Sequence, residues 1–223
     1  MKKIFTFSLL VSFGISAFAA TPITLPLFDD QGIKKWKEKT FSGETFYQIA
    51  TVDNMEVLRA VSQNGASGLF IEQRIDLAKT PFINWRWKIQ NRLSGLQEKN
   101  KSGDDYVARI YLVIKKGWLG LNSQVMNYVW SSNNRQGNIW NNAYVGEKVK
   151  MLAVRDKDAK LNTWYDEKRN VYQDFIHYFG DKGSAKANLN AYRYIDVIAL
   201  MTDTDDSAKK AESFYGNISF TAQ

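Results

Sequence analysis

The chain has 223 residues, of which 44% are hydrophobic and 24% charged, and its 30 Lys and Arg against 23 Asp and Glu give a formal net charge of +7. It contains no cysteine and a single histidine, His177, which excludes disulfides, thiolate nucleophiles and multi-histidine metal sites. This length fits one medium-sized domain with a full hydrophobic core.

The N-terminal segment is typical of a secretory signal peptide. Lys2 and Lys3 precede an apolar run that ends at Phe18, and small residues stand at alternate positions up to Ala19. The run is shorter than the roughly 20 residues that a membrane span needs. We therefore expect cleavage after Ala19, a single mature domain over residues 20–223, no membrane span and a periplasmic or secreted location. Nucleic acid is not an expected partner there.

Period-two patterns predict a series of short strands. In chain order they cover residues 45–50, 56–61, 69–77, 82–90, 105–114, 125–131, 148–155, 193–201 and 214–220. Residues 82–90 alternate most clearly, because Trp85 and Trp87 share one face and polar residues occupy the other. Residues 105–114 are apolar on both faces, which is typical of a central strand, although Arg109 intrudes on one of them.

One segment favours a helix. Between Glu167 and Phe179 the apolar residues recur at three- and four-residue steps, and the pattern stops at Gly180. His177 lies on this segment beside acidic residues, so we expect it to be a solvated surface residue. Short strands with a single late helix predict a mainly β fold, an antiparallel two-sheet β-sandwich resembling a jelly roll.

Several sequence blocks, taken in their order, resemble an exported bacterial family catalogued as domain of unknown function 3047. They are Ala66-Ser67-Gly68-Leu69, Trp85-Arg86-Trp87-Lys88, the run from Gly103 to Tyr111, Tyr128-Val129-Trp130, the run from Met201 to Asp206, and Tyr215-Gly216-Asn217-Ile218. This resemblance implies export but no established activity. The final strand also resembles the closing strand of galactose-binding-like carbohydrate modules, which suggests glycan recognition.

The acidic run after residues 193–201 is a candidate calcium site. Asp203, Asp205 and Asp206 offer hard oxygen ligands, with Thr202 or loop carbonyls able to add more. The spacing lacks the glycine and distal glutamate of a helix–loop–helix calcium site. The alternative is an acidic turn whose aspartates accept hydrogen bonds from backbone amides.

Arg109 needs a partner, because an unpaired buried charge is costly. Asp105 lies on the same strand face by parity, and the other candidate is an acid from a neighbouring strand, such as Asp196. A buried pair that sets strand register and a ligand-facing role remain alternatives. If the tryptophan strand is concave, Arg86, Lys88, Asp105 and Arg109 line one charged cleft.

Aromatic rings suggest sugar stacking. Trp85 and Trp87 are expected in the core, whereas the better candidates for stacking are Trp118, Trp130, Trp140 and Trp164. Asparagines between Ser131 and Asn142 add amides suited to hydroxyl groups, or form a long polar hairpin.

These observations favour a non-catalytic ligand-binding protein that recognises a glycan or envelope saccharide. The expected contacts are Arg86, Asp105, Arg109, Trp130 and Trp140. One alternative is a glycan hydrolase or lyase that pairs Asp104 or Asp105 with Asp203 or Asp205. Another is an envelope scaffold whose exposed aromatic residues meet a second protein.

Overall fold

The tryptophan strand is the centre of one of two stacked sheets. In the computed structural model, which describes residues 20–117 and 122–223, this strand is β6 (Phe82–Ile89). One edge of β6 pairs with β11 (Tyr165–Asn170), and the other pairs in succession with β13 (Lys210–Tyr215) and β14 (Ser219–Thr221). The first sheet is completed by β1 (Ile23–Thr24), β3 (Thr45–Val52) and β4 (Met55–Gln63).

The second sheet packs against the first. Its strand order is β2 (Lys37–Ser42), β5 (Ala66–Asp76), β12 (Tyr194–Asp203), β7 (Arg109–Ile114), β8 (Gln124–Trp130), β10 (Gly146–Arg155) and β9 (Ile139–Asn142). The structure thus confirms a mainly β sandwich. One pair departs from the antiparallel prediction, because the chain leaves β8, forms the edge strand β9 and returns as β10 between them, parallel to β8.

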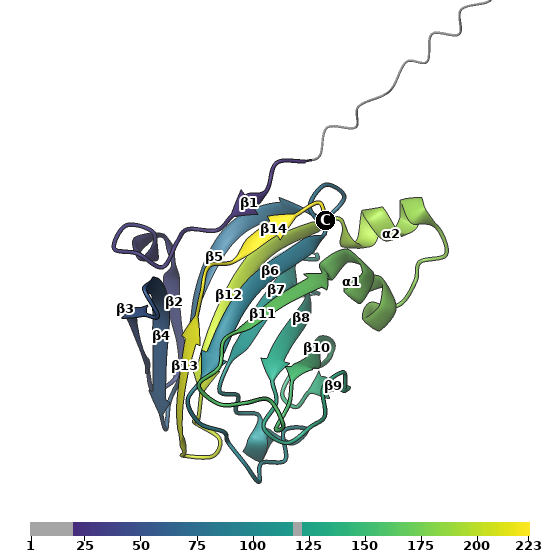
Figure 1. Ribbon diagram of the computed structural model, residues 1–223. Coiled ribbons are helices and arrows are strands. Elements are labelled where there is room, and N and C mark those ends of the chain that lie inside the picture. Colours follow the sequence, from purple (N-terminus) through teal and green to yellow (C-terminus); the bar gives the residue numbers. More distant parts are fainter. Residues whose placement is uncertain (1–19, 118–121) are drawn as a thin grey trace, which may run out of the picture.

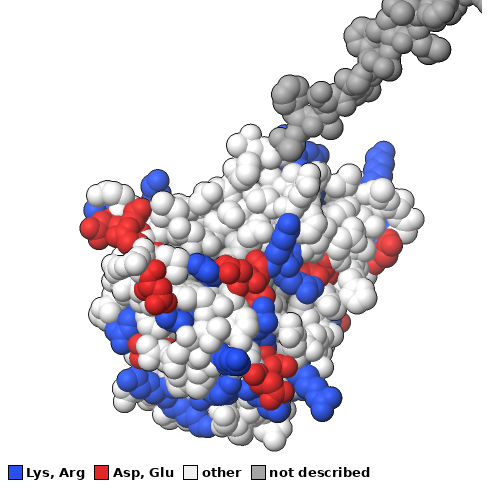
Figure 2. Space-filling view, in the orientation of Figure 1, with Lys and Arg blue, Asp and Glu red and all other residues white. Residues whose placement is uncertain are grey.

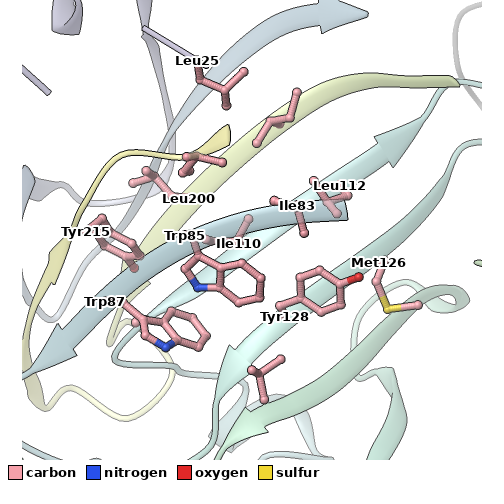
Figure 3. Close-up of a cluster of buried hydrophobic side chains, with 14 of the residues drawn as sticks. Leu25, Ile83, Trp85, Trp87, Ile110, Leu112, Met126, Tyr128, Leu200 and Tyr215 are labelled. Atoms are coloured by element: carbon pink, nitrogen blue, oxygen red, sulfur yellow. The ribbon is translucent and has the colours of Figure 1, made fainter. Parts of the chain in front are cut away.

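Aromatic residues from both sheets fill the space between them (Figure 3). Trp85 stacks on Tyr128 of the opposite sheet with ring centroids 5.4 Å apart. Trp87 packs against Trp130. Alternation makes this possible, since the residues between them on β6 point away from the core. Offset and tilted aromatic pairs of this kind each stabilise a core by roughly 1 kcal/mol beyond the area that they bury.

Two α-helices and two short 3-10 turns complete the described part of the chain. The helices α1 (Val171–Phe179) and α2 (Ala185–Tyr192) lie together at one edge of the sandwich in Figure 1, and the 3-10 turns cover Ile33–Lys35 and Lys101–Gly103. The predicted helix begins four residues later than expected. Asn170 caps it by accepting a hydrogen bond from the Gln173 N–H at 3.0 Å, and the preceding residues pair with β6 as β11 instead.

The sequence prediction missed α2, as well as strands β1, β2, β9 and β11. The α2 helix has only eight residues and buries Asn188 and Tyr192, so it offers little apolar periodicity to detect, but Ser184 caps it by accepting from the Ala187 N–H. The predicted strand at 214–220 is broken into β13 and β14 around Gly216. The predicted strand at 105–114 is regular only from Arg109 onward.

Candidate functional site

A groove of about 650 Å³ runs over the outer face of the second sheet. Strand alternation builds its floor: Ile110 and Leu112 of β7 point into the core, and Arg109, Tyr111 and Val113 point outward. The same alternation on the neighbouring strands adds Phe70, Val125, Val197 and Ala199. Two exposed rings stand at its sides, Phe41 on edge strand β2 and Tyr144 between β9 and β10, with 62% and 54% of their surface exposed. We call this the strand groove.

Carboxylates gather at one end of the strand groove. Asp203 is the last residue of β12 and Arg109 the first of β7, and the two strands are antiparallel neighbours. The loop before β7 contributes Asp104 and Asp105, and the turn after β12 contributes Asp205 and Asp206. We call Asp104, Asp105, Arg109, Asp203, Asp205 and Asp206 the acidic end. Sequence segments about a hundred residues apart therefore supply one site.

The partner of Arg109 is Asp203. Its Nη2 donates to Asp203 Oδ2 at 2.5 Å, and its Nη1 lies 4.0 Å from Asp104 Oδ2. The expectation of an acid on a neighbouring strand is confirmed, since β12 neighbours β7, but the two residues named for the role, Asp105 and Asp196, are wrong, because backbone amides occupy both. Asp105 accepts from the N–H groups of residues 206 and 207, and Asp196 accepts from that of residue 115.

Burial shifts the ionisation of this cluster. Burial raises the pKa of Asp203 well above its ordinary value, and Asp105 and Asp104 add to that shift while Arg109 opposes it. Burial also raises the pKa of Asp104. Burial opposes the charge of Arg109, but the carboxylate of Asp203 raises its pKa above the ordinary value. For Asp205, burial together with the nearby Asp206 and Asp105 raises the pKa. The acidic end therefore holds negative charge at a cost, which a bound cation would reduce.

Three carboxylates meet closely enough to hold a metal ion. One oxygen from each of Asp105, Asp203 and Asp205 lies within 4.8 Å of the others. The set differs from the predicted calcium ligands, because the carboxylate of Asp206 turns away to accept a hydrogen bond from the Tyr144 hydroxyl, while Asp105 approaches from the loop before β7. The acidic-turn alternative also has support, since Asp105 accepts two backbone hydrogen bonds.

Arg86 lies on the other side of the molecule. It points outward from β6 of the first sheet, where it pairs with Asp166 at 3.0 Å and lines a second hollow of about 730 Å³. Lys88 shares that face and lies over the ring of Trp164, 4.9 Å from its centroid. The predicted cleft joining Arg86 and Lys88 to Arg109 is therefore wrong, because the two sheets separate them. Figure 2 shows one face of the molecule, with the two charge signs intermingled across its middle and no single basic patch there.

Two tryptophans predicted to stack on a sugar, Trp130 and Trp140, are buried and therefore cannot do so. Trp130 is fully enclosed between the sheets. Trp140 is also buried, and it packs on Tyr106 with ring centroids 6.5 Å apart in a small apolar cluster on the outer side of the second sheet. Trp164 donates a hydrogen bond to Asp53 at 2.8 Å on the first sheet, and Trp118 lies outside the described residues.

Asn133, Asn134 and His177 do not line the strand groove. The amides of Asn133 and Asn134 donate to the buried carboxylate of Glu98 at 3.0 and 2.7 Å, so they hold a loop together. His177 is exposed on α1, with its ring against that of Tyr178.

Sequence reasoning missed Phe41, Tyr111 and Tyr144. One signal was available, because β7 and β12 are apolar on both faces and only one face of a sandwich strand can point into the core. The aromatic ring of Tyr144 could not have been assigned, since it reaches the site on a loop.

The family model for "Protein of unknown function (DUF3047)" matches residues 34–219. The chain belongs to this family. No curated protein matches it. Neither α1 nor α2, nor any other helix in the described part of this DUF3047 protein, has the length and apolar character to cross a membrane.

Several solved structures share the sandwich at low similarity. One is the family 11 carbohydrate-binding module of the cellulase Lic26A-Cel5E of Clostridium thermocellum, at 13% identity and TM-score 0.48 over 91% of this chain and 95% of that one. Another is the CBM27-1 module of Caldicellulosiruptor saccharolyticus in complex with mannohexaose, at 13% identity and TM-score 0.43 over 91% and 98%. A third is endoglucanase 3 of Trichoderma harzianum, at 7% identity and TM-score 0.40 over 84% and 97%. At this similarity neither the ligand nor the activity of those proteins can be assigned to this chain.

Proposed function

We propose that this DUF3047 protein is an exported binding protein that holds a saccharide in the strand groove without catalysis. Export rests on the signal-like residues 1–19, which lie outside the described structure. Saccharide binding rests on the groove itself, where aromatic rings and hydrogen-bonding side chains face the same open space.

One observation carries the proposal. Among the described residues, the exposed large apolar side chains are Leu27, Phe41, Phe46, Ile139, Tyr144 and Val145, and three of these six line the strand groove. Exposed apolar surface that gathers beside a groove marks a binding site. Flat rings match the apolar faces of pyranoses, and the partly exposed carboxylates of Asp205 and Asp206 at the acidic end can bind their hydroxyl groups.

The test is calorimetric titration of the protein with a panel of neutral and charged oligosaccharides. The Tyr144→Ala variant should bind its glycan roughly tenfold more weakly, because it loses a stacking ring. Phe46→Ala is the matched control: Phe46 is 59% exposed but belongs to β3 of the first sheet, so its loss should leave binding unchanged. If no oligosaccharide in the panel binds, the proposal is refuted.

Prolonged incubation of the protein with the same oligosaccharides separates binding from hydrolysis. Of the four candidate carboxylates, Asp203 is held by Arg109, Asp104 by Asn142 and Asp105 by backbone amides, which leaves Asp205 without the second free carboxyl group that hydrolysis needs. We therefore expect no new reducing ends after prolonged incubation with a bound glycan. Product formation that disappears in Asp205→Asn would establish the hydrolase alternative instead.

A further inference from the structure

The acidic end has more negative than positive charge, although the chain as a whole is basic. Five carboxyl groups lie there with one guanidinium, and Asp203 binds that guanidinium directly. In the described part of the chain, no lysine or arginine forms an ion pair with Asp105, Asp205 or Asp206. The local excess of negative charge is therefore available to a ligand.

The carboxylates differ in how far the protein already uses them. Asp104 accepts hydrogen bonds from Asn142 at 2.8 Å and from the Tyr106 hydroxyl at 3.3 Å. Asp105 accepts from two backbone amides. Asp205 is partly exposed, lines the groove, and receives no hydrogen bond from another described side chain. Asp205 is thus the carboxylate best placed to meet a ligand.

The two exposed rings stand beside these carboxylates. The Tyr144 hydroxyl donates to Asp206, which places its ring at the acidic end. Across the sheet, Ser42 pairs with Ala66, and Ala66 pairs with Asp203, so Phe41 stands on the other side of the same end. A sugar ring that stacks on either aromatic residue brings its substituents to the carboxylates.

Cations already gather on these rings. The ammonium of Lys39 lies 5.1 Å from the Phe41 ring centroid, and that of Lys101 lies 5.2 Å from the Tyr144 centroid. Neither ammonium forms an ion pair with a described carboxylate. The lysines occupy ring faces but leave Asp205 and Asp206 unpaired, so a ligand ammonium group would bind at these carboxylates beside the rings.

We propose that the saccharide in the strand groove carries a protonated amine, as a glucosamine without its acetyl group does, and that Asp205 and Asp206 bind this amine. The inference rests on the proposed saccharide-binding function and names the charge that the site selects. An acetylated amino sugar presents a neutral amide at that position and forms no ion pair with the carboxylates.

The experiment compares two hexasaccharides that differ only in acetylation. Calorimetric titrations of the full chain with a glucosamine hexamer and an N-acetylglucosamine hexamer are run at about pH 6, where a sugar amine is protonated, with a chelator present. The glucosamine hexamer should bind on the order of tenfold more tightly, as expected for a charge-assisted hydrogen bond. The preference should weaken as salt is added.

Two variants show whether the preference arises at the acidic end. Asp205→Asn should remove most of it. Asp166→Asn is the matched control, because Asp166 is an exposed acid on β11 of the opposite sheet, paired with Arg86. Its loss should leave the preference intact. The net positive charge of the chain repels a polycation, so non-specific attraction does not mimic this result.

The outcomes separate the inference from the proposed function. Equal binding of both hexamers, or a preference that survives Asp205→Asn, overturns the inference and leaves saccharide binding in place. Binding of neutral panel glycans without binding of the glucosamine hexamer also overturns the inference alone. A complete absence of saccharide binding overturns both.

Discussion

Arg109 holds a buried positive charge against the carboxylates of Asp203 and Asp104, and the first sheet supports it from behind. The Arg109 backbone N–H donates to the Tyr215 hydroxyl at 3.2 Å, and that hydroxyl donates to the Met201 carbonyl at 2.7 Å. Tyr215 belongs to β13, so a side chain that crosses the core fixes the start of β7. The groove floor and the sandwich core are therefore coupled through one residue.

Replacing Arg109 should destabilise the fold. Arg109→Met leaves a buried carboxylate without its partner, which should lower the free energy of unfolding by about 3–5 kcal/mol in urea denaturation. Arg109→Met combined with Asp203→Asn should recover part of that loss, because the unpaired charge is gone. Lys115→Met, which removes an exposed pair with Glu72, should cost about 1 kcal/mol or less. An Arg109→Met variant as stable as the wild type would contradict the structural role of the pair.

Asp205 should make the free energy of unfolding fall as the pH rises, which is the reverse of the usual effect of an aspartate. Because burial and its acidic neighbours raise its pKa, the folded chain binds this proton more tightly than the unfolded chain does. The contribution of Asp205 to stability is present below the unfolded pKa and is lost as pH rises through the folded pKa. Asp205→Asn should therefore be more stable than the wild type at neutral pH, and the difference should vanish below about pH 4.

Asp53 is the control for that measurement, because its pKa is shifted in the opposite direction. Hydrogen bonds from Trp164 and Lys88 lower the pKa of Asp53, so Asp53→Asn should destabilise the protein at neutral pH and converge with the wild type in acid. Thermal melting of the three proteins across pH gives both differences. A wild-type advantage over Asp205→Asn at neutral pH would show that its carboxylate is stabilised by a contact other than those described.

At the scale of elements, the acidic end depends on loops that strands hold in register. The turn after β12 and the loop before β7 hydrogen-bond to each other through the carboxylate of Asp105, and the Asp203 N–H donates to the Tyr106 carbonyl at 3.2 Å. Two antiparallel neighbours thus bring five carboxylates together although neither segment alone has a metal-binding motif.

Calcium binding at this turn stays a prediction, now with a different ligand set. If Asp105, Asp203 and Asp205 hold calcium, millimolar calcium should raise the melting temperature, by an amount that corresponds to about 2.7 kcal/mol at a hundredfold excess over Kd. Asp205→Asn should abolish the increase, whereas Asp206→Asn should retain it. A melting temperature that neither calcium nor a chelator moves would exclude the site.

How far the sequence predicts these elements depends on the range of the interaction. Alternation in residues 82–90 is local, so the strand and its core tryptophans were correctly predicted. The Arg109–Asp203 pair joins residues 94 apart in the chain, and only the register of β7 against β12 brings them together. Trp130 and Trp140 were misplaced because pattern alone does not say that the opposite sheet covers Trp130, or that Tyr106 from the loop before β7 packs on Trp140.

At the scale of the whole molecule, the two-sheet arrangement explains both the successes and the failures of the predicted site. Apolar residues on both faces of β7 correctly indicated a central strand, but the outer face is the floor of the strand groove. The charged cleft failed because Arg86 and Arg109 belong to different sheets with the full core between them. Parity along one strand predicts a shared face, whereas the assignment of strands to sheets needs the fold.

The two ends of the described chain meet in one sheet, and this has a consequence for folding. Ile23 pairs with Phe220, and the Leu25 N–H donates to the Ile218 carbonyl at 2.9 Å. The first sheet can close only when its last strand is present, so folding must be dominated by contacts between distant parts of the chain and should be slow. Slow closure would favour the export that we propose from residues 1–19, because a chain that has not yet closed its first sheet can still be threaded across a membrane.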